Sequence, residues 1–194
     1  MVVDGGSTDK TVSIVERLGV RVLNCDRCGR SYQMNKGGAA ASGELLYFVH
    51  SDTLPPDNFA TSVREAVASG YEIGCFQSCF DSKRWLLKLN GFFSRFDRLW
   101  CRGGDQTLFV TKRLFDELDG YRPDMKIMEE YDFIIRARQQ AQFKIIPHRV
   151  LVSARKYQNR SFFKVQFANL VVFNLFRFGA SQERLVRTYR QLLG

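Results

Sequence analysis

Acidic residues stand at three places in this sequence where a turn meets a strand or a helix. Asp4 opens the motif D-G-G-S-T-D, and Asp52 follows the apolar run L-L-Y-F-V-H-S. Glu129 and Glu130 are adjacent in M-E-E-Y-D-F, at the start of an expected helix. Carboxylates at such places can hold a ribose hydroxyl or a base, ligate Mg²⁺ or Mn²⁺, or remove a proton from a hydroxyl group. They are candidates for nucleotide binding, metal binding and general-base catalysis, respectively.

Each motif also has an ordinary structural explanation. D-G-G-S is a common junction between a strand and a helix, with Ser7 as the helix cap. A carboxylate at the end of a strand is more often a turn acceptor than a metal ligand. Acidic residues are common in the first turn of a helix because they stabilise its positive end. Taken singly, the motifs leave both explanations open.

The elements that must position these residues follow from hydrophobic periodicity and turn residues. Strands are expected at residues 1–4, 20–24, 44–50, 72–80, 107–110, 143–146 and 150–153. Helices are expected after Ser7, at 31–42, 57–69, 85–100, 112–118 and 128–140, and twice near the carboxyl end. This alternation predicts an α/β domain with a mainly parallel sheet flanked by helices. Ligands of such sheets bind beyond the carboxyl ends of the strands, which would bring Asp4 and Asp52 to one rim.

Five motifs follow one another in a fixed order along the chain. They are D-G-G-S-T-D-K-T, G-R-S-Y-Q-M-N-K-G-G-A, F-V-H-S-D-T, G-D-Q-T-L-F-V and M-E-E-Y-D-F-x-x-R. The ordered set resembles the family 2 glycosyltransferases, and more narrowly a bacterial branch whose members read Q-M-N-x-G and F-x-H-x-D-T. The likeness extends from Met1 to about Tyr157. It implies a GT-A fold, which is Rossmann-like, a nucleoside-diphosphate sugar donor, and Mg²⁺ or Mn²⁺ as cofactor.

The resemblance also implies roles for individual residues. The donor would be held by Asp4, Gly5, Arg30, Gln33, Asn35 and Asp52. Asp52 would be the metal ligand, and Asp105 and Gln106 would contact the sugar or the acceptor. Glu130 and Glu129 would correspond to the acidic pair that supplies the catalytic base. Members of this kind are usually inverting enzymes, in which the base deprotonates the acceptor as it attacks the anomeric carbon.

The sequence departs from the family pattern in three respects. The family's first strand should precede Met1 and is absent from this sequence. His50 stands where many relatives carry an aspartate, so metal coordination would rest on Asp52 alone. Glu130 stands where relatives usually have an aspartate that is one methylene shorter. An ångström of displacement can cost about 10²-fold in rate, so this last change bears on efficiency.

The charge distribution bears on the partners. The net charge is +9, and basic residues concentrate at 83–102 and 149–190 among Phe, Leu and Trp side chains. This mixture favours a membrane surface over a nucleic-acid groove, and no nucleic-acid-binding module is present. A solvated basic face is the alternative. No run of about 20 apolar residues predicts a spanning helix, and the segment 162–178 could lie in a membrane interface or pack on the sheet as a core helix.

These observations divide the chain into a catalytic domain at 1–157 and a helical, interfacial extension at 158–194. The start lacks a signal peptide and the count of five cysteines is odd, which favours the cytoplasm, including the inner face of the membrane. The expected function is sugar transfer to an acceptor hydroxyl, with a lipid or lipid-linked acceptor. The alternative is a non-catalytic remnant that binds a partner or forms a homodimer through the open edge of a sheet without its first strand.

Overall fold

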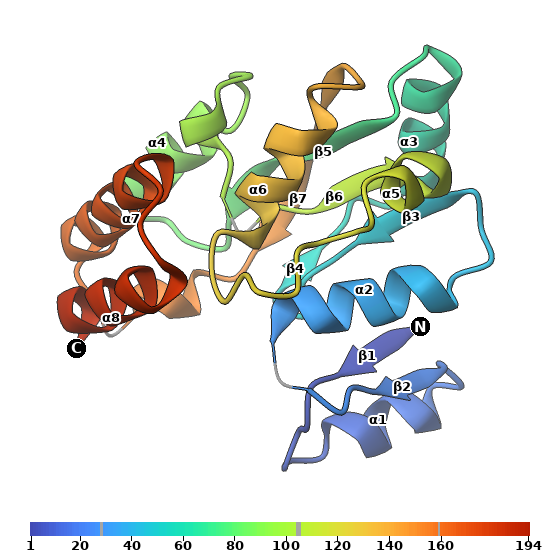
Figure 1. The fold of residues 1–194 in the computed structure, drawn as a ribbon, viewed down its shortest axis with the longest axis horizontal. Helices are drawn as coiled ribbons and strands as arrows, with labels where there is room; N and C mark the ends of the chain where they lie inside the picture. Colours follow the sequence, from blue (N-terminus) through green and yellow to red (C-terminus); the bar gives the residue numbers. More distant parts are fainter. Residues whose placement is uncertain (28, 104–105, 159) are drawn as a thin grey trace.

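The computed structural model describes residues 1–27, 29–103, 106–158 and 160–194 (Figure 1). The strands are β1 (Val2–Asp4), β2 (Val22–Asn24), β3 (Leu45–Phe48), β4 (Thr53–Leu54), β5 (Ile73–Phe80), β6 (Leu108–Thr111) and β7 (Phe143–Val152). The α-helices are α1 (Thr11–Arg17), α2 (Arg30–Ala40), α3 (Phe59–Ala68), α4 (Trp85–Phe93), α5 (Lys112–Glu117), α6 (Glu129–Ala137), α7 (Phe162–Arg177) and α8 (Gln182–Leu193). Two short 3₁₀ helices are η1 (Leu99–Cys101) and η2 (Ala154–Tyr157).

The strands form two separate sheets. β1 and β2 pair in parallel, and a five-stranded sheet has the order β3-β6-β5-β7-β4. Within the larger sheet β5 and β7 are parallel, whereas the β3–β6, β5–β6 and β4–β7 pairs are antiparallel. The α/β class is confirmed, but the expectation of a mainly parallel sheet is wrong for these pairings. Periodicity identifies strands without fixing their direction, and β6 enters between β3 and β5 in the opposite direction.

β7 corrects another expectation, because the two strands expected at 143–146 and 150–153 are one strand that ends at Val152. The register against β5 shifts between Phe76 and Gln77, so that Ile146 pairs with Phe76 and Arg149 with Gln77. The two residues skipped on β7 include Pro147, which has no N–H to give to the ladder. The apparent break in the sequence is therefore a bulge.

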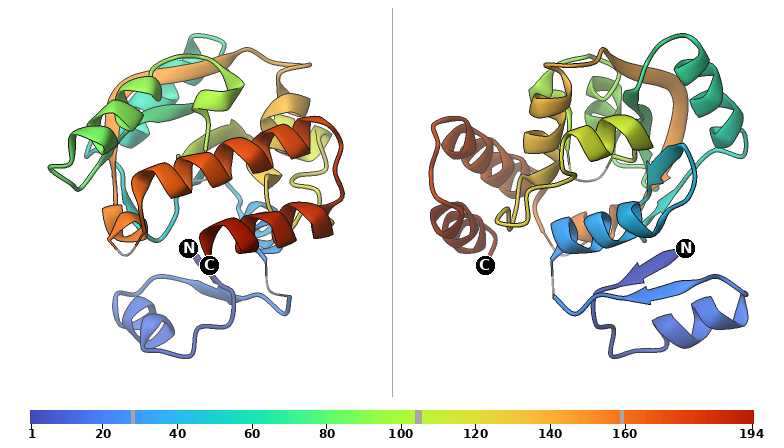
Figure 2. Two further views of the ribbon diagram at one scale, coloured as in Figure 1. Left: turned by 90° about the vertical axis from the view of Figure 1, so that its left-hand side faces the viewer. Right: turned by 45° about the vertical axis from the view of Figure 1, so that its right-hand side comes forward.

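The core lies on both faces of the larger sheet. Leu108 and Val110 pack with residues of α5 and α6, while Phe109 between them packs with residues of α3. This alternation follows from the two-residue period of a strand. Helices therefore cover the two faces, with α5 and α6 on one and α3 on the other (Figure 2).

The C-terminal helices α7 and α8 pack against each other and against α4 (Figure 1). A third buried cluster joins Leu87 of α4 and Tyr157 of η2 to α7 and α8 through Val165, Ala168 and Leu193. The extension is thus tied into the fold by its own apolar contacts. None of the helices described here combines the length and the apolar character that crossing a bilayer requires.

Candidate active site

A basic and two acidic side chains from distant parts of the sequence meet where two helices begin. Arg30 is the first residue of α2, and Glu129 and Glu130 are the first two residues of α6. Arg30 Nη2 donates a hydrogen bond of 3.0 Å to Glu130 Oε1, and Arg30 Nε lies 3.3 Å from Glu129 Oε1. His50, which follows β3, also contacts this carboxylate, since its Nε2 lies 2.9 Å from Glu130 Oε1. Two side chains therefore fix the orientation of Glu130.

The two glutamates are buried, whereas Arg30 reaches solvent. Glu129 is 3% exposed and Glu130 is 7% exposed, while the Arg30 side chain is 45% exposed. Burial raises the pKa of Glu129 above its ordinary value, and the nearby Arg30 guanidinium offsets this only in part. A carboxylate with a raised pKa binds a proton more strongly and is a better general base near neutral pH. The raised basicity belongs to Glu129, whereas the contacts with Arg30 and His50 fix the orientation of Glu130.

The segment before α6 is held by side chains from other helices. Ser31 Oγ of α2 donates a hydrogen bond of 2.9 Å to the Met125 carbonyl. Gln182 of α8 accepts from the backbone N–H of Lys126 at 2.9 Å and of Ile127 at 3.2 Å. Met128 then adopts a left-handed conformation with φ of 66° before the helix starts. The start of α6 is thus set by contacts with both α2 and α8.

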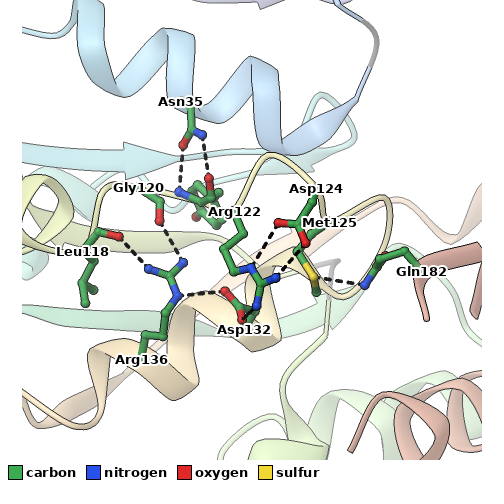
Figure 3. Close-up of polar contacts among 10 residues, drawn as sticks. Asn35, Leu118, Gly120, Arg122, Asp124, Met125, Asp132, Arg136 and Gln182 are labelled. Carbon is green, nitrogen blue, oxygen red and sulfur yellow. Dashed lines mark hydrogen bonds and ion pairs between the residues drawn. The ribbon is translucent and has the colours of Figure 1, made fainter. Parts of the chain in front are cut away.

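The loop between α5 and α6 is fixed in a similar way (Figure 3). Asn35 of α2 donates to the Tyr121 carbonyl at 2.7 Å and accepts from the Tyr121 N–H at 2.8 Å. Arg136 of α6 donates to the carbonyls of Leu118 at 2.7 Å and Gly120 at 2.8 Å, and pairs with Asp132. Asn35, expected in the donor site, uses both ends of its amide in this loop; its donor role stays a prediction.

A cavity of about 200 Å³ lies beside the glutamate pair. Its wall includes Arg30, Gly103, Lys126, Ile127, Met128, Glu129, Glu130, Tyr131, Lys156, Asn169 and Tyr189. Asn169 belongs to α7 and Tyr189 to α8, so the C-terminal helices contribute to the cavity wall. Lys126 also pairs with Glu183 of α8, with 3.0 Å between Nζ and Oε1. The cavity joins a proton acceptor to basic and polar side chains.

The Asp4 carboxylate is engaged by its own turn. Its Oδ2 accepts from the N–H groups of Gly6 and Ser7, both at 2.9 Å, and its Oδ1 accepts from the Ser7 hydroxyl at 2.5 Å. These bonds hold the pKa of Asp4 below its ordinary value, with the Ser7 hydroxyl as the main cause. A carboxylate offers about four acceptor positions, so room remains for a ligand donor. The nucleotide-binding role of Asp4 stays a prediction.

Gln33 connects this turn region to α2. Its Nε2 donates a hydrogen bond of 3.0 Å to the Val3 carbonyl in β1. A side chain on Gly5 would place its first carbon 2.9 Å from the same Nε2 atom, so glycine permits the close approach of the turn to α2. Gly5 and Gln33, expected in the donor site, are thus neighbours and serve to dock β1 on the rest of the chain.

Asp52 lies in the turn between β3 and β4, with its side chain 33% exposed. Its Oδ2 is 3.6 Å from Arg155 Nη2. Among the described residues, no group of three or more His, Cys, Asp or Glu side chains is arranged to hold a metal ion. An accessible single carboxylate still fits Mg²⁺ or Mn²⁺, because such ions are commonly held by one or two carboxylates together with substrate phosphates and water. The residues present fit a metal that takes its other ligands from the substrate.

Gln106 lies close to the glutamates but uses its amide within the protein. Its Nε2 donates to the Cys101 carbonyl at 3.1 Å, and its Oε1 accepts from Cys75 Sγ at 3.5 Å. Gln106 and Glu130 line the same small second cavity, so the two motifs do come together. Asp105, the other expected acceptor contact, lies outside the described residues.

The sequence motifs missed several residues of this region. The buried Arg102 donates to the carbonyls of Ser94 and Phe96, at 2.6 and 2.7 Å, and contacts Cys75 Sγ. The cavity residues Lys126 and Lys156 do not belong to the five motifs, and Asn169 and Tyr189 lie beyond Tyr157, where the family likeness ends. The sequence offered two signals, the proximity of Lys126 to M-E-E-Y and the position of Lys156 at the end of the family likeness.

Comparisons with known proteins identify the family and the fold of this chain. The profile of the family described as "Glycosyl transferase family 2" matches residues 1–149, whereas no curated protein sequence matches the chain. Among solved structures, the mannosyltransferase PcManGT from Pyrobaculum calidifontis has a TM-score of 0.65 at 17% identity, over 98% of this chain and 59% of that one. Residues 1–349 of S. aureus TarS give 0.64 at 15% identity, over 96% of this chain and 58% of that one.

A third similar structure is glucosyl-3-phosphoglycerate synthase from Mycobacterium tuberculosis, with a TM-score of 0.59 at 19% identity. The match covers 93% of this chain and 68% of that one. This chain therefore spans somewhat more than half of the first two structures and about two thirds of the third. At these identities the likeness shows the fold, which is that of the GT-A glycosyltransferases. Because the family profile covers most of its length, the chain belongs to glycosyl transferase family 2.

Proposed function

We propose that this protein transfers a sugar from a nucleoside-diphosphate sugar to an acceptor hydroxyl, with inversion at the anomeric carbon. The observation that carries the proposal is the buried Glu129–Glu130 pair, which Arg30 and His50 orient at the wall of a cavity. A general base for a hydroxyl needs this combination of an oriented carboxylate and space for the acceptor.

The donor class is supported by what the similar structures contain. The Pyrobaculum mannosyltransferase was solved with GDP-mannose and Mn²⁺, and the mycobacterial synthase with UDP-glucose and Mn²⁺. We propose that this chain also uses a nucleoside-diphosphate sugar as donor and a divalent cation. The screen described below would identify the nucleobase and the sugar of its donor.

In the proposed reaction Glu130 is the base. It takes the proton of the acceptor hydroxyl while the acceptor oxygen forms a bond to the anomeric carbon and the bond from that carbon to the diphosphate oxygen breaks. Attack from the side opposite the diphosphate inverts the configuration. Arg30 and His50 hold Glu130 Oε1, which restricts rotation of the carboxylate during proton transfer. Glu129 keeps Arg30 in place through its own ion pair.

The negative charge of the departing diphosphate needs stabilisation. We propose Asp52 as the protein ligand of Mg²⁺ or Mn²⁺, which would supply that stabilisation when bound. Arg155, 3.6 Å from Asp52 Oδ2, is placed to contact the same phosphates if the metal takes over the carboxylate. Asp4 and its turn would hold the nucleoside part of the donor.

The acceptor would enter the cavity between α6 and the C-terminal helices. Lys126, Lys156 and Tyr189 line this space together with the two glutamates. Basic and aromatic side chains suit an acceptor that carries an anionic group beside its hydroxyl, as lipid phosphates do. We therefore propose a lipid or lipid-linked acceptor, in keeping with the basic and apolar character of the carboxyl half.

The test is a thermal-shift screen of Mn²⁺ and Mg²⁺ with nucleoside-diphosphate sugars, followed by measurement of nucleoside diphosphate release. At 100 times the dissociation constant, a ligand should add about 2.7 kcal/mol of stability. We expect a metal-dependent shift with one nucleotide, lost in Asp52→Ala. The matched control is Asp57→Ala, five residues along and exposed, which should retain the shift.

Two results would count against the proposal. If no nucleotide in the panel gave a metal-dependent shift of the melting temperature, the proposed donor site would be wrong. A shift that Asp52→Ala leaves unchanged would instead remove Asp52 as the ligand and leave nucleotide binding in place.

A further inference from the structure

Large apolar side chains are exposed along two neighbouring helical segments. In the segment 85–100, which contains α4 and η1, they are Trp85, Leu89, Phe92, Phe93, Phe96 and Trp100. On α7 and just after it they are Phe163, Phe167, Leu170 and Phe178. We call these ten residues the aromatic face. Trp85 is 69% exposed and Trp100 is 59% exposed, and they are the two tryptophans of the sequence.

The exposed residues lie on the outer sides of helices whose inner sides are buried together. Leu87 of α4 shares a buried cluster with Val165 and Ala168 of α7. The exposed positions of α7 are spaced by four and then three residues from Phe163, so they form one stripe. Figure 2 (left) shows α4 and α7 on the same side of the molecule. Helices that are apolar on both sides are normally covered on both.

The rings of the segment 85–100 are already assembled into a cluster. The ring centroids of Phe92 and Phe96 are 5.6 Å apart, and those of Phe93 and Trp100 are 5.8 Å apart. Arg95 lies over the Phe92 ring, with 4.1 Å between its guanidinium carbon and the ring centroid. This ring cluster of Phe92, Phe93, Phe96 and Trp100 is therefore contiguous, with a basic side chain at its margin.

Basic residues surround this surface and acidic ones are scarce. Between residues 83 and 100 the exposed basic residues are Lys83, Arg84, Lys88, Arg95 and Arg98, against the single acid Asp97. Asp97 is already paired with Arg138. Between residues 160 and 178 there are Arg160, Lys164 and Arg177 and no acidic residue. The aromatic face thus has an almost uniformly positive rim.

This charge pattern decides between two occupants of the face. A second copy docking through a two-fold axis would bring the same basic rims together, and like charges across an interface are unfavourable. A membrane surface rich in anionic lipid has the complementary charge. Tryptophan and phenylalanine with flanking Lys and Arg are also the side chains of interfacial helices.

We propose that the aromatic face docks on an anionic lipid surface. Its rings enter the boundary between headgroups and acyl chains, and its basic rim contacts lipid phosphates. This inference goes beyond the proposed sugar transfer and does not depend on it, because lipid binding is measured without any substrate. One connection to the cavity follows, since α7 contributes both Phe167 to the face and Asn169 to the cavity wall.

Tryptophan emission of the full chain tests the proposal directly, because both tryptophans belong to the face. The chain is titrated with phosphatidylcholine vesicles, and with vesicles in which roughly a third of the lipid is phosphatidylglycerol. We expect a shift of the emission to shorter wavelength, and co-sedimentation, only with the anionic vesicles. Raising the salt concentration should weaken binding because the headgroup attraction is screened.

Two pairs of variants separate the apolar from the charged contribution. Phe163→Ser with Phe167→Ser removes rings, and Lys88→Glu with Lys164→Glu reverses two charges of the rim. Each double variant should lower the vesicle partition coefficient by about ten-fold or more. The matched controls are Leu18→Ser and Arg64→Glu, which are exposed but lie outside the face and should bind as the unmodified chain does.

Three outcomes would overturn the proposal. The first is unchanged emission and no sedimentation with either vesicle. The second is a loss of binding in the controls as large as in the face variants. The third is a dimer in light scattering without lipid that Phe163→Ser with Phe167→Ser converts to a monomer, because the face would then be covered by a second copy.

Discussion

The amino-terminal unit β1–α1–β2 and the region around α6 are built in different ways. In α1 no residue is buried, and the Asp4 turn is held by bonds among its own residues. In α6 five of nine residues are buried, including Glu129 and Glu130. The proposed nucleoside site therefore rests on local contacts, whereas the proposed base rests on the packing of the whole domain.

Helix α2 connects these two regions. Arg30 reaches the glutamates, Gln33 reaches β1, and Asn35 holds the loop before α6. These residues are spaced along the helix, so each contact can be removed without touching the others. Substitutions in α2 should therefore separate effects on donor binding from effects on the proposed base.

The largest effect is expected from Glu130→Gln, which keeps the shape of the side chain and removes the proposed base. We expect kcat to fall by about 10²–10⁴-fold while the affinity for the donor stays the same. Steady-state release of nucleoside diphosphate and donor titration measure the two quantities. Glu117→Gln, an exposed glutamate of α5 paired with Arg113, is the control. Equal losses of kcat and donor affinity would contradict the division between the two regions.

Asn35→Ala should give the next largest effect. It leaves the N–H and the carbonyl of the buried Tyr121 without their partner, which should cost about 2–3 kcal/mol. For a chain of this size the melting temperature should fall by roughly 4–12 °C. Asn174→Ala is the matched control, because that exposed amide donates to the Leu170 carbonyl within its own helix. A fall of the same size in the control would show that the loop contact is unimportant.

Gln33→Ala should have a smaller and local effect, of about 1 kcal/mol. Losing the bond to the Val3 carbonyl loosens the attachment of β1. Amide hydrogen exchange should become faster in residues 2–24 and stay unchanged in the five-stranded sheet. Asn35→Ala should do the reverse and speed exchange around residues 118–125. Faster exchange across the entire chain in both variants would mean that the two regions do not open separately.

The smallest effect concerns the pH dependence of Glu129→Gln. Because the pKa of Glu129 is raised in the folded protein, the carboxyl stabilises the fold in its protonated form. That contribution is complete below the ordinary value of 4.5 and is lost as the pH rises through the raised value. The variant should therefore melt at a higher temperature than the unmodified chain at neutral pH, with the gap closing towards pH 4.5. A gap that does not change with pH would exclude this cause.

Local patterns predicted most of the helices and strands, because the hydrophobic periodicity of each is visible within a few residues. The Trp85–Trp100 segment is the main exception. It forms α4 and η1 in place of one helix, since the buried Arg102 takes the carbonyls of Ser94 and Phe96. Ser7 was expected to cap α1, but it bonds to Asp4 and the helix starts at Thr11.

The motifs included Arg30, Glu129 and Glu130 of the candidate site, but they did not predict the contacts among these residues. The motifs named Arg30 and Glu130 separately, one for the donor and one for the base. Their hydrogen bond joins residues 100 apart in sequence, and no local pattern contains such a distance. For the same reason, local patterns did not predict that α7 and α8 contribute to the cavity wall or that β6 is antiparallel to its neighbours.

Met128, the left-handed residue before α6, links the thermal stability of this protein to the rigidity of the segment that precedes Glu129 and Glu130. A non-glycine residue with φ of 66° is less favourable than glycine by about 1–2 kcal/mol. An engineer seeking thermostability would place glycine there, and the gain would be reduced by the greater freedom of glycine in the unfolded chain. Glycine is also freer to leave this conformation, and Glu129 and Glu130 follow immediately. A more stable fold and a less rigid position of the proposed base would then come from one and the same substitution.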